Sequence, residues 1–65
     1  AIRVRFRDHS GSDTFRTGSG FYFKVTYDHK NRLYKVHKYD RRSRLIKTSV
    51  YPYDVVMKIE EELET

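Results

Sequence analysis

The sequence predicts an α+β fold in which a three- to four-stranded antiparallel β-sheet packs on one C-terminal α-helix. Three observations lead to this prediction. Apolar and polar side chains alternate along four segments separated by polar turns. The last segment, residues 52–64, instead spaces its apolar residues three or four positions apart. A chain of 65 residues has room for one small domain, residues 1–65.

The first strand is expected over residues 1–7, where Ile2, Val4 and Phe6 alternate with arginines. Residues 8–20 are expected to form a long loop, because they contain all three glycines and many Ser and Thr residues. Phe15 is the residue in this loop that could anchor it to the core.

Three further strands are expected over residues 21–27, 32–39 and 45–51. The turns between them are short and polar, so neighbouring strands are predicted to be antiparallel.

The helix is predicted to begin at Pro52, which suits a first helical turn, and Asp54 lies where a negative charge favours the helix N-terminus. Its apolar stripe consists of Val55, Val56, Ile59 and Leu63, and would cover one face of the sheet. The predicted core is Ile2, Val4, Phe6, Phe21, Phe23, Val25, Tyr34, Val36, Ile46, Val50, Val56, Ile59 and Leu63.

Charge is distributed unevenly along the chain. Residues 1–51 carry thirteen Lys/Arg against four Asp, a net charge of +9. Residues 52–65 carry one Lys against five Asp/Glu, a net charge of −4. A basic body favours a polyanionic partner, nucleic acid first and an anionic membrane surface second. Ordinary solubility charge is the plainer interpretation.

If the helix covers the apolar face of the sheet, the opposite face is cationic and rich in hydroxyl groups. Lys and Arg neutralise phosphates, and Tyr can stack on bases. The predicted nucleic-acid-binding residues are Arg3, Arg5, Arg7, Tyr22, Lys24, Thr26, Lys35, His37, Tyr39, Arg41, Arg42, Arg44 and Lys47, with Ser49 and Tyr51 on the same face. The three tyrosines also fit the general preference of β-strands for Tyr.

The pattern G-F-Y-F-K-V-T-Y-D-H-K-N-R-L-Y-K-V from Gly20, followed by P-Y-D-V-V-M-K-I-E-E-E-L from Pro52, resembles the arm-type DNA-binding domain of tyrosine-recombinase integrases. That AP2-like domain has a three-stranded sheet on one C-terminal helix, with its open face in the DNA major groove. The resemblance covers residues 20–64 and does not include the first strand or the loop after it. The chain also resembles transcriptional coactivator domains that bind single-stranded DNA through a four-stranded sheet backed by a helix, and these work as dimers.

The expected function is a small basic nucleic-acid-binding module, with DNA favoured over RNA. The alternative is a protein-interaction module that regulates a larger enzyme or complex through the sheet face or the edge strand, residues 1–7. We expect a monomer or weak dimer in the cytoplasm, associated with the nucleoid or nucleus if it binds DNA. No membrane partner is expected, because the basic residues lie on strands rather than on an amphipathic helix.

Catalytic, metal and cofactor sites are not expected. The chain has no cysteine, which excludes disulfides and thiolate metal sites. His9, His29 and His37 lack the close spacing of zinc ligands. The glycine-containing segment before Phe21 lacks the spacing of a nucleotide phosphate loop, and a flexible linker explains it better.

Overall fold

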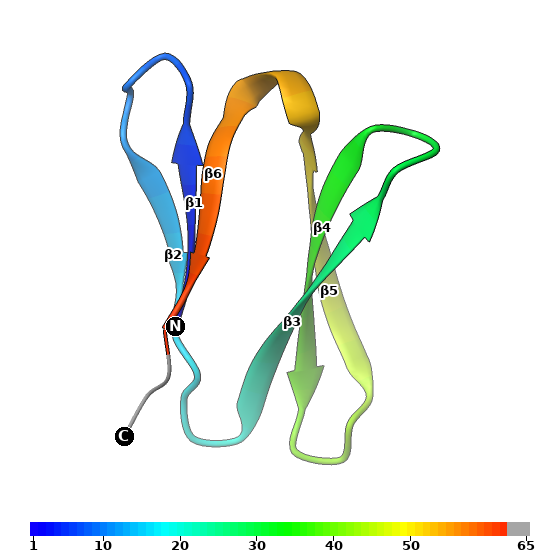
Figure 1. Cartoon of the computed structure of the whole chain (residues 1–65). Helices are drawn as coiled ribbons and strands as arrows, with labels where there is room; N and C mark the ends of the chain where they lie inside the picture. Colours follow the sequence, from blue (N-terminus) through cyan, green and yellow to red (C-terminus); the bar gives the residue numbers. More distant parts are fainter. Residues whose placement is uncertain (63–65) are drawn as a thin grey trace.

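The computed structural model describes residues 1–62, and they form an all-β molecule with two three-stranded antiparallel sheets (Figure 1). The elements in chain order are β1 (Ile2–Phe6), β2 (Ser12–Phe15), β3 (Phe21–Asp28), β4 (Leu33–Asp40), β5 (Leu45–Pro52), a 3₁₀ turn η1 (Tyr53–Val55) and β6 (Val56–Glu61).

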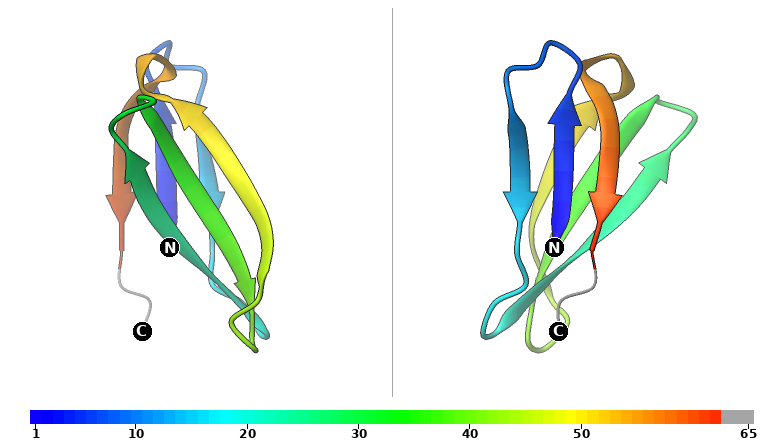
Figure 2. Two further views of the ribbon diagram at one scale, coloured as in Figure 1. Left: turned by 90° about the vertical axis from the view of Figure 1, so that its right-hand side faces the viewer. Right: turned by 60° about the vertical axis from the view of Figure 1, so that its left-hand side comes forward.

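The first sheet has the strand order β2-β1-β6, so β1 is its central strand. The second sheet is a simple meander, β3-β4-β5. The two sheets face each other, and the strands of one run obliquely across those of the other (Figure 2). The link from β2 to β3 and the β4–β5 turn lie at one end of the molecule, and η1 lies at the other (Figure 1).

The core lies between the two sheets and is small. Its buried members are Ile2 and Val4 from β1, Val36 from β4 and Val56 from β6. Half-buried side chains from both sheets surround them: Phe6, Phe15, Phe23, Val25, Tyr34, Tyr51 and Ile59. Burial of apolar area on both inner faces is what holds the sheets together.

Tyr51 connects the outer strands of the two sheets. Its ring lies 6.0 Å from that of Phe6 and 6.4 Å from that of Phe15. Its hydroxyl group donates a 2.8 Å hydrogen bond to Asp13 Oδ2 on β2. Burial, with this bond to a carboxylate, raises the pKa of Tyr51. One side chain of β5 thus contacts β1 and β2 of the opposite sheet.

The predicted α+β class is wrong, because residues 52–64 do not form a helix within the described chain. Residues 53–55 make a single 3₁₀ turn, and the chain then continues as β6 beside β1. A β-bulge explains the misleading pattern. Arg5 pairs with Lys58 and Phe6 with Val56, which leaves Met57 unpaired. The extra residue lets Val56 and Ile59, three positions apart, both face the core.

The predicted loop 8–20 contains strand β2, which pairs with β1 from Ser12 to Phe15. Phe15 packs against the core, as expected. Because β2 covers one side of β1 and β6 covers the other, the expectation that residues 1–7 form an edge strand is wrong. The other predicted strands are confirmed, with ends within one residue of those observed.

The predicted orientation of β5 is also wrong. Ser49 pairs with the buried Val36, and Tyr51 pairs with Tyr34, so these residues face the core. Ile46 and Val50 were predicted to be buried but are about half exposed. Of the remaining predicted core residues, Phe21 does not pack against the buried cluster, although its ring lies 5.9 Å from that of Phe23. Leu63 lies outside the described residues.

Among residues 1–62, no helix has the length and apolar character needed to cross a membrane.

Val4 is buried in the core, whereas Val50 is half exposed on β5. Val4→Ala removes buried methyl groups from the core, and we expect it to lower the free energy of unfolding by about 2 kcal/mol or to unfold the chain. Val50→Ala is the matched control and should change it by less than about 0.5 kcal/mol. Urea unfolding of both variants measures this. Equal losses would contradict the orientation of β5.

Candidate functional site

The strongest cluster of functional side chains lies on the outer face of the second sheet, the face turned away from the core. Side chains alternate along β3 and β4, and Val25 and Val36 point inward. Their neighbours therefore point outward. The pairs Tyr22–Tyr39, Lys24–His37 and Thr26–Lys35 stand opposite each other across the two strands. The structure thus brings together six of the predicted site residues: Tyr22, Lys24, Thr26, Lys35, His37 and Tyr39.

Tyr22, Lys24 and Tyr39 form a compact group, called here the tyrosine platform. The two rings stack with centroids 5.3 Å apart and planes 19° from parallel. Lys24 Nζ lies 5.9 Å from the Tyr22 centroid and 5.8 Å from the Tyr39 centroid, within range of a cation–π interaction. Lys24 makes no ion pair with any residue in the described chain. The platform therefore offers aromatic surface beside an uncompensated positive charge.

His37 lies beside the platform and joins all three strands of the second sheet. Its Nε2 is 2.8 Å from Thr26 Oγ1 on β3, and its Nδ1 is 3.0 Å from Thr48 Oγ1 on β5. Each ring nitrogen has a hydroxyl partner, so the ring is held between β3 and β5. The centroid of His37 lies 6.3 Å from that of Tyr39, which extends the aromatic surface.

Lys35 is the least available cation on this face. Its Nζ lies 3.6 Å from Asp28 Oδ2 at the end of β3. Asp28 also accepts hydrogen bonds from the backbone and side chain of Asn31, and these, with the nearby Lys35, lower the pKa of Asp28. Lys35 thus faces a carboxylate that remains ionised.

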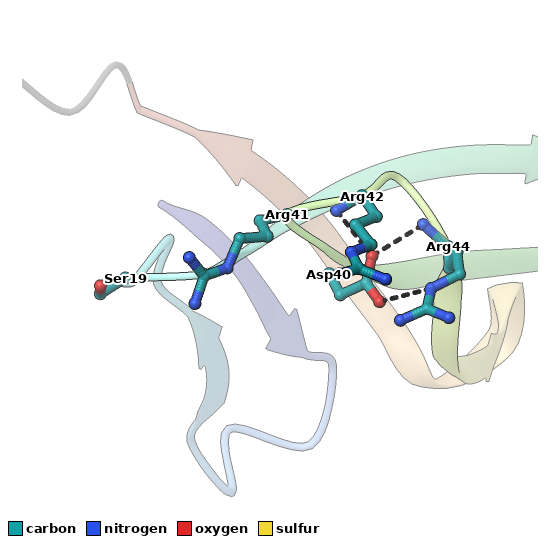
Figure 3. Close-up of a pocket in the computed structure, with 6 residues that line it drawn as sticks. Ser19, Asp40, Arg41, Arg42 and Arg44 are labelled. Atoms are coloured by element: carbon teal, nitrogen blue, oxygen red, sulfur yellow. Dashed lines mark hydrogen bonds and ion pairs between the residues drawn. The ribbon is translucent and has the colours of Figure 1, made fainter.

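The β4–β5 turn, residues 40–44 and called here the arginine turn, adds Arg41, Arg42 and Arg44 to the end of this face. Asp40 shapes the turn: its Oδ1 accepts from the backbone N–H groups of Arg42 (2.8 Å) and Arg44 (3.0 Å), and its Oδ2 accepts from Arg44 Nε (3.0 Å), as Figure 3 shows. Ser43 takes a left-handed backbone conformation, with φ 62°. Tyr22 donates a 2.9 Å hydrogen bond to Ser43 Oγ. The turn is therefore fixed to the tyrosine platform.

The arginines of β1 do not join this surface. Arg3 and Arg5 belong to the first sheet and point away from the core on the opposite side of the molecule. Arg5 forms an ion pair with Glu60 of β6, which lowers the pKa of that carboxyl group. Arg3 stands opposite Glu60 in the register. The single cationic platform expected from the sequence is thus divided between two sheets.

Lys47, with Ser49 and Tyr51, was also expected on the cationic face, but all three point to the inner side of β5. Lys47 stands opposite Lys38 at the end of the sheet that carries the arginine turn. Lys38 Nζ lies 4.4 Å from the ring centroid of Phe21. Like charges placed opposite each other repel, and this pair adds two positive charges to the end of the sheet near the arginines.

The three-dimensional division of charge is sharper than the division along the chain. Residues 20–52, which include the whole second sheet, carry nine Lys/Arg against two Asp, a net charge of +7. The remaining residues carry five Lys/Arg against seven Asp/Glu, a net charge of −2. The acidic β6 compensates the first sheet, and the second sheet keeps its positive charge.

Two features of this region escaped the sequence analysis. Leu45, Ile46 and Val50 are 56%, 56% and 50% exposed along β5. Ser19 and Gly20 line an open hollow with the arginine turn. The first feature follows from the inward orientation of Tyr51, which places Val50 outside, and from a register shift at Lys38/Tyr39 that leaves Ile46 unpaired. The second arises from two loops that are distant in sequence.

Two of the three histidines contact neighbouring hydroxyl groups. His29 Nδ1 lies 3.0 Å from the Tyr53 hydroxyl group, and His37 is engaged by two threonines. Among the described residues, no three His, Cys, Asp or Glu side chains gather closely enough to hold a metal ion.

Comparison with known proteins gave no match to this chain among family models, curated proteins or solved structures. The helix that both sequence resemblances imply is absent from residues 1–62.

The hydrogen bonds of Asp40 lead to a pH-dependence prediction. The backbone N–H of Arg44 is the main cause of a lowered Asp40 pKa, so the stabilisation of the turn is present above the ordinary aspartate value and is lost as pH falls. We expect the amide signals of Arg42 and Arg44 to titrate with a midpoint below about 3.9. Asp40→Asn should abolish this titration, and Asp8→Asn should preserve it. A midpoint at or above 3.9 would contradict the arrangement.

Proposed function

We propose that this chain binds single-stranded nucleic acid on the outer face of its second sheet. The observation that carries the proposal is the tyrosine platform, fixed to the arginine turn by the hydrogen bond from Tyr22 to Ser43. Stacking surface next to a track of positive charge is the usual basis of binding to unpaired strands.

The parts of this face have separate roles. Bases would stack on the rings of Tyr22 and Tyr39, which every base can do because every base has a π-face. Lys24 and the arginine turn would neutralise phosphates and release counterions. Thr26 and Thr48 would add hydroxyl groups at the surface beside His37. Stacking requires unpaired bases, which favours a single strand over a duplex.

The rest of the chain offers a weaker site. The outer face of the first sheet has a mixed charge, because Glu60 lies beside Arg3 and Arg5. That sheet has no aromatic pair on its outer face, since Phe6 and Phe15 pack into the core. The proposal therefore assigns the nucleic acid to one side of the molecule, and Arg3 no longer belongs to the proposed site.

Paired substitutions test the proposal. Lys24→Ala and Tyr39→Ala should each weaken binding of a labelled single-stranded DNA oligonucleotide, with Tyr39→Ala costing about 1–3 kcal/mol. Arg3→Ala removes the same charge as Lys24→Ala from the other sheet and should leave the affinity unchanged. Fluorescence anisotropy at several salt concentrations measures this, with duplex DNA and single-stranded RNA as comparisons. Affinity that is independent of salt, or equal losses in the Lys24 and Arg3 variants, would refute the proposal.

A second function is favoured by one observation. Strand β5 is an edge strand, pairs only with β4 among the described strands, and exposes Leu45, Ile46 and Val50. An extended segment of a partner protein could pair with this edge and cover these side chains.

The double variant Ile46→Asn, Val50→Asn separates the two functions. It should abolish capture of a partner from nuclease-treated cell extract and leave oligonucleotide binding intact. Lys24→Ala should show the reverse. A captured protein that is retained by the double variant would exclude the β5 edge as its binding site.

A further inference from the structure

An open hollow lies at the end of the molecule, where two loops that are distant in sequence come together. One wall is the segment between β2 and β3, with Ser19 and Gly20, and the other is the arginine turn. Its volume is about 680 Å³. Figure 3 shows Arg41 extended toward Ser19, with Arg42 and Arg44 grouped around Asp40. Among the residues that the structure describes, no apolar side chain lines the hollow, so the lining favours a polar ligand.

The charge of the hollow is strongly positive. Three guanidinium groups line it, with Asp40 as the one carboxylate among the lining residues. Both oxygens of that carboxylate already accept hydrogen bonds from Arg42 and Arg44. Asp40 thus orders the turn, and Arg44 is the arginine it partly neutralises.

Two arginines remain uncompensated. Within residues 1–62, the guanidinium groups of Arg41 and Arg42 make no hydrogen bond or ion pair. Both belong to a turn that is closed by backbone hydrogen bonds from Ser43 N to Asp40 O and from Asp40 N to Arg44 O, each 3.0 Å long. Free cations on an ordered backbone lose less entropy on binding than cations on a mobile loop.

The opposite wall, residues 19–20, lies close to Arg41. Gly20 has φ +90°, a conformation that side chains disfavour, and its position is close to Arg41: a Cβ atom there would lie 4.0 Å from Arg41 Nε. Ser19 also lines the hollow and carries a hydroxyl group, a neutral donor. Planar guanidinium groups with hydroxyl donors are the groups that match phosphate oxygens.

We infer that this hollow binds a phosphate group, held by Arg41 and Arg42 with help from Arg44 and Ser19. The inference deepens the proposed function and rests on it, since the nucleic acid bound on the tyrosine platform is the expected source of the phosphate. The Tyr22–Ser43 hydrogen bond places the platform directly beside the hollow. A strand could therefore stack a base on Tyr22 and Tyr39 while a neighbouring phosphate enters the hollow.

The test uses the whole chain, labelled with nitrogen-15, and follows amide signals during titration with pyrophosphate and with inorganic phosphate. We expect saturable shifts at Ser19, Gly20 and residues 41–44. The double variant Arg41→Ala, Arg42→Ala should weaken pyrophosphate binding about tenfold or more, because hydrogen bonds to charged groups contribute more free energy than those between neutral groups. Arg3→Ala, Lys58→Ala removes the same charge from the first sheet and should leave the affinity unchanged. Shifts without saturation, or equal losses in the two double variants, would overturn the inference.

Oligonucleotides with and without a 5′-phosphate identify the source of the phosphate. Tighter binding of the phosphorylated strand, lost in the Arg41/Arg42 variant, assigns the hollow to a terminal phosphate. Equal affinity of the two oligonucleotides, together with competition by pyrophosphate, assigns the hollow to a phosphate within the strand. If pyrophosphate does not compete with the oligonucleotide, the hollow is refuted as the site of the strand's phosphate. The proposed function would still stand. Saturable pyrophosphate binding without oligonucleotide binding would support phosphate binding in the hollow and refute the proposed function.

Discussion

The position of Tyr51 determines how the rest of the surface is arranged. Side chains alternate along a strand, so a shift of one residue would exchange the two faces of β5. Tyr51 prevents that exchange, because its ring packs on Phe6 and Phe15 and its hydroxyl group reaches Asp13 on the opposite sheet. With Tyr51 inside, Thr48 and Val50 must lie outside. Thr48 is then in place to bind His37, and Val50 becomes exposed.

The second constraint is the placement of acidic residues. As a helix, residues 52–64 would have covered the apolar face of a single sheet, and all the arginines would have lain on the other face. As strand β6, this segment instead sets Glu60 against the arginines of β1. One sheet is thereby neutralised, and the other keeps Lys24 and the arginine turn unbalanced. The acidic segment thus confines positive charge to one side of the molecule.

The parts of the fold that the sequence predicted share a simple local cause. In β3 and β4 the alternation is unbroken, Val25 and Val36 mark the inner face, and a short turn fixes the register. The outward positions of Tyr22, Lys24 and Tyr39 could therefore be predicted from the sequence. Prediction failed at Met57, where a bulge changed the alternation of β6. It failed in β5 because Ser49 and Tyr51, rather than Ile46 and Val50, face the core. A bulge in β6 spaces inward residues by three, which is also the spacing of a helix stripe.

Other failures depended on contacts between segments far apart in sequence. The pairing of Ser12–Phe15 with β1 made a strand from a segment rich in Gly, Ser and Thr, a composition typical of loops. Tyr51 and Val50 are neighbours on β5, so only one of them can face the core. Valine is the more hydrophobic residue, so the local sequence favours an inward Val50. The hydrogen bond to Asp13 and the rings of Phe6 and Phe15 favour Tyr51, and none of these lies near it in the chain.

The central claim is that one side of this molecule, the outer face of the second sheet with its arginine turn, binds a nucleic-acid strand. Amide-shift mapping of the labelled chain with an unmodified single-stranded oligonucleotide tests it most directly. The account predicts the largest shifts at Tyr22, Lys24, Tyr39 and residues 41–44, with the amides of Arg3 and Lys58 unmoved. Shifts centred on β1 and β6, or spread evenly over both sheets, would contradict it.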